Sequence, residues 1–235
     1  ALDSGINFFD TSNVYGEGHS ESLIGKTFLK FRDRVLIATK VGLVNYDEPA
    51  NYSINNLSKS LQGSLKRLKT DYIDLLQLHN PSPDIIHHNH DILTWVNQLK
   101  KKGIIRAFGV SVRSPKEGII AIEKLNPESI QVNFNLLDHR AIESGLMKSA
   151  ATNQVSLIAR TPLCFGFLSG KLHSTTHFDK QTIVAFGLTS IFTTGSEALK
   201  KFSHVKGILP YKQTHNLRLG FVYLTLESQL QFQEY

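Results

Sequence analysis

The sequence predicts an α/β fold, for which a (β/α)8 TIM barrel is the best geometric solution. Short apolar runs alternate with longer amphipathic stretches, and the connections between them are short. This alternation is typical of parallel strands joined by right-handed helical crossovers. No G-x-G-x-x-G motif follows a predicted strand, which argues against a doubly wound dinucleotide-binding fold. The length of 235 residues suits a single barrel domain over residues 1–235.

Six apolar runs are the predicted strands. They cover residues 6–10, 35–40, 72–81, 104–111, 129–135 and 155–161. The second run, VLIATK, ends in Lys40, and the third, YIDLLQLHNP, is stopped by Pro81, which cannot donate a hydrogen bond to a sheet. No break in composition separates these runs, so we expect them to form one sheet.

Five helices are predicted between the strands, at residues 19–31, 53–69, 90–103, 114–125 and 140–153. In the second of these, apolar residues recur three and four positions apart and therefore share one helical face. They are Ile54, Leu57, Leu61, Leu65 and Leu68. Ser114 followed by Pro115 is typical of a helix start, and Gly103 is typical of a helix end.

The stretch from 172 to 194 differs from the rest of the chain. It contains Thr, Ser and His without a clean period. We predict an irregular loop there, either a functional lid or an ordinary surface excursion. Residues 196–228 have a helical pattern again.

Composition and charge disfavour several classes of protein. The chain carries 26 Lys and Arg against 20 Asp and Glu, a formal charge of +6. These basic residues are scattered, and the densest run, LKKKG at 99–103, is typical of a helix C-terminus. No basic stripe interleaves with aromatic residues, so nucleic-acid binding is the weakest hypothesis. No apolar stretch approaches the ~20 residues of a membrane span.

Cysteine and histidine usage adds two expectations. Cys164 is the only cysteine, which rules out an internal disulfide and fits a reducing compartment. The N-terminus has neither the basic nor the apolar region of a signal peptide, and we expect a cytoplasmic protein. The HHNH stretch at 87–90, at a predicted helix N-terminus, lacks a well-spaced carboxylate or cysteine, so no metal site is expected.

Each predicted strand carries a polar residue at or near its C-terminal end. The set is Asp10, Lys40, His79, Ser111, Gln131 and Arg160. Any single member could be a capping or solvent-facing residue. The C-terminal ends of the strands of a parallel barrel share one rim, where active sites lie. The set as a whole therefore indicates an active site.

The residue types indicate proton-transfer chemistry. A lysine beside Tyr15 would favour the phenolate and lower the tyrosine pKa from about 10. Asp10 would keep Lys40 charged and oriented, while His79 could orient a carbonyl or relay a proton. Tyr15 is then a plausible general acid near neutral pH. The sequence offers no serine elbow or Cys–His pair with supporting context.

Six sequence blocks resemble those of the aldo-keto reductase superfamily, in the same order. GINFFDTSNVYGEGHSESLIGKTF resembles the first signature, VLIATKVG the lysine strand, and RLKTDYIDLLQLHNP the histidine strand. GIIRAFGVSV, SIQVNFNLLD and PLCFGFLSGKL resemble the later blocks. The resemblance covers residues 1–172 well and 196–228 more loosely. It implies hydride transfer between a nicotinamide and an aldehyde, ketone or sugar carbonyl, in either direction.

The resemblance also implies a role for individual residues. The catalytic tetrad falls on Asp10, Tyr15, Lys40 and His79. The cofactor, NADP with NAD as the alternative, would be bound by Ser111, Gln131, Arg160, Thr161, Pro162, Leu163, Gly166 and Lys171. The first two would hold the nicotinamide carboxamide, and the last five belong to the loop that wraps the pyrophosphate.

Two positions differ from the family pattern. Arg160 stands where many members stack an aromatic side chain on the nicotinamide, although a guanidinium plane can also stack. Val112 stands where Asn or Arg is common, and this change removes one polar contact.

The ends of the chain also differ from the family pattern. Strands one and eight of the family barrel, and the segment that grips the adenosine phosphate, are expected to be missing from this sequence. The chain would then be a fragment or a truncated gene product with weakened NADP binding. The alternative to an enzyme is a cofactor-sensing or partner-binding barrel, similar to channel-associated members of the superfamily. The substrate and the oligomeric state stay open.

Overall fold

The computed structural model describes residues 1–88 and 90–169. Its framework is a six-stranded parallel sheet in the order β1-β2-β3-β4-β5-β6. The strands are β1 (Phe8–Asp10), β2 (Leu36–Val41), β3 (Ile73–His79), β4 (Ile105–Ser111), β5 (Ser129–Asn133) and β6 (Ser156–Arg160). All six predicted strands are present, in sequence order. The predicted loop at 172–194, the predicted helix at 196–228 and Lys171 lie outside the described residues.

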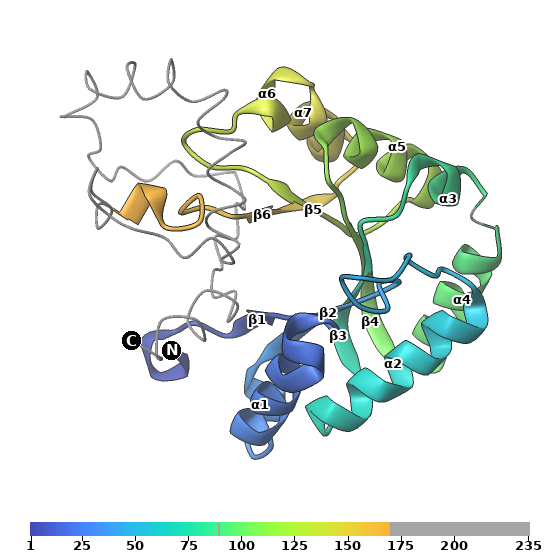
Figure 1. Ribbon diagram of the computed structural model, residues 1–235, viewed down its shortest axis with the longest axis vertical. Helices are drawn as coiled ribbons and strands as arrows, with labels where there is room; N and C mark the ends of the chain where they lie inside the picture. Colours follow the sequence, from blue (N-terminus) through green and yellow to red (C-terminus); the bar gives the residue numbers. More distant parts are fainter. Residues whose placement is uncertain (89, 170–235) are drawn as a thin grey trace.

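Helices follow the strands and cover the outer side of the curved sheet (Figure 1). They are α1 (His19–Phe28), α2 (Ile54–Leu68), α3 (Pro83–His87), α4 (His90–Lys101), α5 (Pro115–Leu125), α6 (Arg140–Glu143) and α7 (Leu146–Thr152). Short 3-10 turns lie at Leu2–Ser4, Tyr15–Gly18, Arg32–Arg34 and Phe167–Ser169. The parallel strands therefore curl into part of a (β/α)8 barrel, as the alternating pattern predicts.

The helix predictions need two corrections. The stretch predicted as one helix at 140–153 is two helices, because Gly145 precedes α7 with a φ of 82°, a left-handed conformation that favours glycine. Helix α3 was not predicted; Ser82 caps it by accepting a hydrogen bond from the Ile85 N–H. The helix predicted from residue 90 is present, since His90 begins α4, while His87 ends α3.

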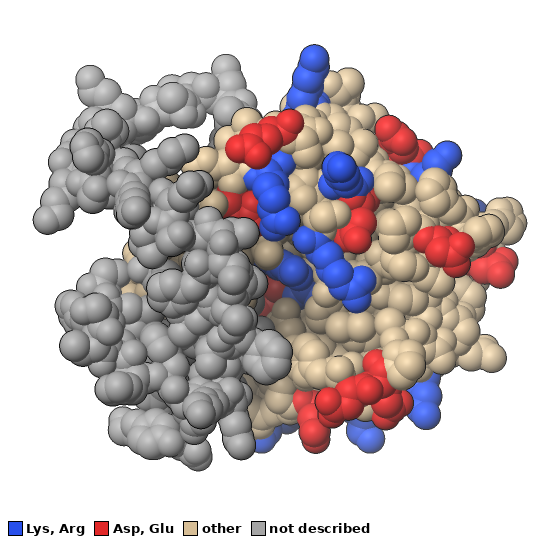
Figure 2. All heavy atoms as spheres, turned by 45° about the horizontal axis from the view of Figure 1, so that its top comes forward, with Lys and Arg blue, Asp and Glu red and all other residues tan. Residues whose placement is uncertain are grey.

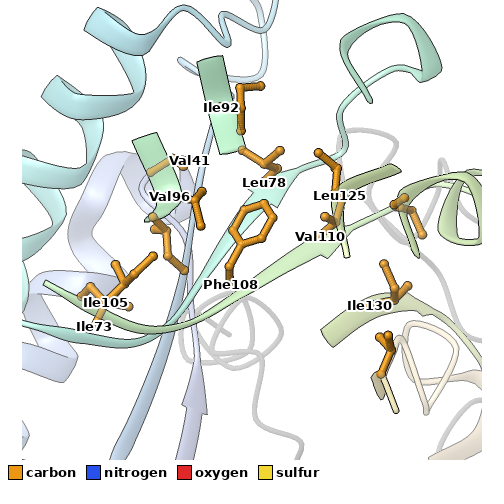
Figure 3. Close-up of a cluster of buried hydrophobic side chains, with 14 of the residues drawn as sticks. Val41, Ile73, Leu78, Ile92, Val96, Ile105, Phe108, Val110, Leu125 and Ile130 are labelled. Atoms are coloured by element: carbon orange, nitrogen blue, oxygen red, sulfur yellow. The ribbon is translucent and has the colours of Figure 1, made fainter. Parts of the chain in front are cut away.

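The apolar core lies between the sheet and its helices. Phe108 of β4 is at its centre and packs among Leu78, Val96 and Val110 (Figure 3). Every residue of β3 is buried, as expected for a parallel strand covered on both faces. On α2 the predicted face is confirmed, because Leu57 and Leu61 are buried against this core.

A buried carboxylate joins α1 to its neighbours. Glu21 is fully buried, and its oxygens accept hydrogen bonds from Thr39 Oγ1 at 2.6 Å and Arg67 Nε at 2.7 Å. Gly25 allows α1 to approach α2 this closely, since a Cβ at that position would lie 2.4 Å from the Arg67 carbonyl oxygen. These contacts fix α1, and with it the turn that precedes α1.

A second charged group, which we call the Asp74 cluster, lies at the N-terminal end of β3. Asp74 accepts hydrogen bonds from Arg32 at 2.6 Å, Arg106 at 2.8 Å and the Ile37 N–H at 2.9 Å. The Tyr72 ring lies against both guanidinium groups, 3.9 Å from that of Arg32 and 4.1 Å from that of Arg106. The cluster thus ties β2, β3 and β4 together at the end opposite the predicted active site.

Candidate active site

The strand register gathers the predicted polar residues at one rim of the sheet. His79 is in register with Ser111, and Ser111 is in register with Gln131. Residues in register on parallel strands point to the same face of a sheet. Asp10 ends β1, and Lys40 lies next to the last residue of β2.

Lys40 is the centre of the site. Its side chain is fully buried, and its ammonium donates hydrogen bonds to Asp10 Oδ2 at 2.6 Å and to the Thr11 carbonyl oxygen at 2.8 Å. A buried ammonium needs such partners, because an unpaired charge is strongly disfavoured away from water. The third contact is with the Tyr15 hydroxyl, at 3.3 Å. Three of the four predicted tetrad residues are therefore in direct contact.

Asp10 is held from a second side by Gln77. The Gln77 amide donates a hydrogen bond to Asp10 Oδ1 at 2.9 Å, so both carboxylate oxygens are engaged. Gln77 is in register with Lys40 on the neighbouring strand and is fully buried. Gln77 was not among the predicted site residues, although a glutamine between two leucines of a predicted strand was an available signal.

Tyr15 begins the turn that follows β1. The Tyr15 N–H donates a hydrogen bond to the Ser12 carbonyl oxygen at 3.2 Å, and the Thr11 and Ser20 hydroxyls lie 2.8 Å apart beneath the turn. The half-buried ring meets the His79 ring edge-on, with 6.1 Å between the ring centres. The turn therefore brings the phenol to both Lys40 and His79.

His79 completes the predicted tetrad and is held as the neutral imidazole. Burial, followed by the charges of Lys40, Arg160 and Arg113, lowers the His79 pKa from 6.5 to about 2. Its Nδ1 lies 3.1 Å from the Ser12 hydroxyl. Ser12 was not among the predicted site residues.

The predicted cofactor residues occupy the other half of the rim. Ser111 and Gln131 are buried. Arg160 Nε donates a hydrogen bond to Asn133 Oδ1 at 2.6 Å, and its guanidinium also contacts Asn80 at 3.4 Å and the Ser111 hydroxyl at 3.5 Å. The guanidinium of Arg160 thus spans the ends of three neighbouring strands. Asn80 and Asn133 were not among the predicted site residues.

The segment after β6 is a series of tight turns. Thr161 accepts a backbone hydrogen bond from Cys164 at 2.9 Å, and Leu163 accepts one from Gly166 at 3.0 Å. The Thr161 hydroxyl lies 3.2 Å from Asn133 Oδ1, while Pro162 is half-buried and Leu163 is exposed. The segment predicted to wrap a pyrophosphate is therefore adjacent to the Arg160 end of the rim.

Neither a candidate metal site nor a membrane-spanning helix is found in the described part of the chain. In residues 1–88 and 90–169, His, Cys, Asp and Glu side chains form no group of three or more that could hold a metal ion. None of the described helices combines the length and apolar character that a membrane crossing requires.

Comparison with known proteins identifies the family. The profile of the Aldo/keto reductase family matches residues 1–215. The chain belongs to this family. The aldo-keto reductase YhdN of Bacillus subtilis is 35% identical over 182 residues, which are 73% of this chain and 52% of YhdN. The Schizosaccharomyces pombe aldo-keto reductase yakc [NADP(+)] is 32% identical over 186 residues, or 76% of this chain and 54% of yakc.

A solved aldo-keto reductase structure confirms the fold. The glycerol dehydrogenase of Gluconobacter oxydans superimposes with a TM-score of 0.67 at 33% identity, and the match covers 77% of this chain and 57% of that one. The six parallel strands are thus part of the (β/α)8 barrel of this family. The chain spans slightly more than half the length of the relatives that it matches.

Proposed function

We propose that this chain carries the active site of an NADP(H)-dependent oxidoreductase acting on an aldehyde, ketone or sugar carbonyl. The observation that carries the proposal is the contact between Tyr15 and Lys40, 3.3 Å apart, with Lys40 held 2.6 Å from Asp10. A phenolic hydroxyl beside a fixed, buried cation is suited to deliver a proton. The name of the Schizosaccharomyces pombe relative, aldo-keto reductase yakc [NADP(+)], supports NADP as the cofactor. We also propose that the protein is located in the cytoplasm.

In the reducing direction, the substrate gains a hydride and a proton. A nicotinamide held at the rim would supply the hydride to the carbonyl carbon. The Tyr15 hydroxyl gives its proton to the carbonyl oxygen, so an alcohol forms and a phenolate stays on the enzyme. The Lys40 ammonium stabilises the phenolate, because its charge is already fixed where negative charge develops. The reverse reaction uses the same groups, with the phenolate as the base.

His79 has a separate role in this scheme. Its low pKa keeps the ring neutral at physiological pH, so it cannot compete with Tyr15 as an acid. Because Nδ1 is paired with Ser12, we assign Nε2 to the hydrogen bond that orients the substrate carbonyl. A neutral imidazole can donate such a bond without adding charge.

The buried polar residues at the rim fit a nicotinamide. Ser111 and Gln131 are buried in register and carry the donor and acceptor groups that an amide pairs with. We assign binding of the nicotinamide carboxamide to these two residues, and we place Arg160 beside the nicotinamide ring. The pyrophosphate is assigned to Thr161, Pro162, Leu163, Gly166 and Lys171.

The test is NADPH oxidation by the purified chain in the presence of a panel of aldehydes and sugars. Tyr15→Phe should lower turnover by roughly 10²- to 10⁴-fold, the usual contribution of a general acid. Tyr46→Phe is the matched control, because Tyr46 is 63% exposed and belongs to no proposed role. Turnover that survives in Tyr15→Phe, or falls equally in both variants, would refute the proposed proton donor.

A further inference from the structure

An open pocket lies on the same rim as the proposed tetrad. Its volume is about 480 Å³. It is lined by Pro49, Ala50, Asn51, Tyr52, Asn80, Ser82, Ile85 and Arg113. These residues come from the segments that follow β2, β3 and β4, and none of them belongs to the proposed tetrad or to the proposed cofactor site.

Two contacts join the pocket to the active site. The Tyr52 hydroxyl donates a hydrogen bond to the His79 carbonyl oxygen at 2.7 Å. Asn80, the next residue, accepts a hydrogen bond from Arg160 at 3.4 Å. A molecule whose carbonyl lies at Tyr15 and His79 therefore has this pocket beside it.

The pocket lining is positively charged. Arg113 is exposed, and no Asp or Glu is among the lining residues. Arg113 takes part in none of the ion pairs found among the described residues. The Glu117 carboxylate nearby accepts hydrogen bonds from the backbone N–H groups of Arg113 and Ser114 and completes the cap of α5.

The positive charge extends from the pocket to the catalytic residues. Arg113 and Arg160 act with Lys40 to lower the His79 pKa, so both guanidinium groups are close enough to affect that ring. Lys40 is itself paired with Asp10. Basic side chains form a run across the middle of the molecular face in Figure 2, with acidic side chains along its flanks.

We propose that the pocket at Arg113 binds a phosphate or carboxylate group of the carbonyl substrate, so that anionic carbonyl compounds are preferred over neutral ones. The donor fork of the Arg113 guanidinium suits planar carboxylates and tetrahedral phosphates. The side-chain amides of Asn51 and Asn80 can add further hydrogen-bond donors. This inference rests on the proposed function, because the pocket would bind the end of the substrate opposite the carbonyl that reacts at the same active site.

The first experiment compares glyceraldehyde 3-phosphate with glyceraldehyde, which differ only in the phosphate. In Arg113→Gln, kcat/KM for the phosphorylated aldehyde should fall about ten- to hundredfold, the range of one charge-assisted interaction. For glyceraldehyde, kcat/KM should not change. Lys116→Gln is the matched control, because it removes the same charge from an exposed residue outside the pocket lining and should affect neither substrate.

Added salt provides an independent readout. Because Arg113 is exposed, raising the salt should narrow the difference between the two aldehydes in the unmodified chain and leave Arg113→Gln unchanged. Equal losses for both aldehydes, no loss for either, or a change only in the KM for NADPH would overturn the inference. The last of these results would assign Arg113 to the cofactor instead.

A binding measurement separates this inference from the proposed function. If no carbonyl compound of the panel is turned over, the proposed function fails. Inorganic phosphate is then titrated calorimetrically into the unmodified chain, Arg113→Gln and Lys116→Gln. Phosphate binding that is lost in Arg113→Gln but kept in Lys116→Gln would still support an anion pocket. Equal binding to all three proteins, or no binding to any, would overturn it.

Discussion

The two ends of the sheet each carry a buried charged cluster, built from similar residues. At the N-terminal end, Asp74 is 6% exposed and is engaged by two arginines and a backbone N–H. At the C-terminal end, Asp10 is 10% exposed and is engaged by Lys40 and Gln77. In both clusters a carboxylate has both oxygens satisfied by neighbouring strands, as burial of a charge requires.

The clusters differ in what lies beyond the carboxylate. In the Asp74 cluster the aromatic ring of Tyr72 lies against the two guanidinium groups, and its hydroxyl takes no part in the carboxylate contacts. At the other end the Tyr15 hydroxyl itself is within 3.3 Å of the cation. Only the second arrangement couples a transferable proton to a fixed charge. In (β/α)8 barrels, residues at the N-terminal ends of the strands usually contribute to stability, and the active site lies at the C-terminal ends.

The largest effect is expected from Lys40→Met, which removes the central charge. Turnover should fall roughly 10²- to 10⁴-fold, and the free energy of unfolding should fall by about 3 kcal/mol because Asp10 is left buried without its cation. Urea unfolding and a turnover assay measure the two effects. The double variant Lys40→Met with Asp10→Asn should regain stability but not turnover. Recovery of turnover in the double variant would contradict a role for the charge in catalysis.

Asp74→Ala should have the opposite profile. The free energy of unfolding should fall by about 3 kcal/mol, since Arg32 and the Ile37 N–H lose their buried partner. The turnover per folded molecule should stay within about twofold of the unmodified value, because additive, independent behaviour is expected of distant sites. Loss of turnover in material shown to be folded would mean that the two ends are coupled.

Acidification should destabilise the chain through His79. Its pKa of about 2 in the folded state lies below the ordinary value of 6.5, so the unfolded chain binds the proton more tightly. The stability that this histidine contributes is complete above its unfolded pKa and is lost as the pH falls through the window between the two values. From about pH 6 to about pH 4, the unmodified chain should lose roughly 2–3 kcal/mol more than His79→Gln. Parallel acid-unfolding curves would show that the ring is not buried as the neutral form.

Gln77→Met should have the smallest effect of the four. It removes one hydrogen bond to Asp10 but also removes the Gln77 side-chain oxygen, which has no hydrogen-bond partner among the described residues. The net cost should be about 1 kcal/mol, with turnover reduced less than about tenfold. Ser129→Ala is the control, since the Ser129 hydroxyl is likewise buried without a described partner and its removal should be nearly neutral. A large loss of stability in Ser129→Ala would contradict the inference that its buried hydroxyl contributes nothing to the free energy of unfolding.

The two clusters also show which site residues could be predicted from the sequence. Asp10, Lys40 and His79 were predictable because each follows an apolar run, and parallel strands bring their C-terminal ends to one rim. Ser12 and Gln77 were not predicted, because their roles depend on which residues the strand register places beside them. The hydrogen bonds of Arg160 to Asn133 and Asn80 likewise join segments far apart in the chain.

Helix boundaries were harder to predict than the site. Residues 140–153 have a continuous helical pattern, and the break at Gly145 depends on a left-handed backbone that the pattern does not encode. Helix α3 spans only Pro83–His87, which is too short to produce a clear period. The strands were easier to predict because each lies within a short, mainly apolar run.

The most direct test of the division between the two clusters measures turnover and unfolding together in Tyr15→Phe and Asp74→Ala. Tyr15→Phe should lose turnover while its free energy of unfolding stays within about 1 kcal/mol of the unmodified value, because only one half-buried hydroxyl is removed. Asp74→Ala should lose stability and keep its turnover per folded molecule. If Tyr15→Phe retains full turnover with a carbonyl substrate that the unmodified chain reduces, the proposed proton donor is wrong.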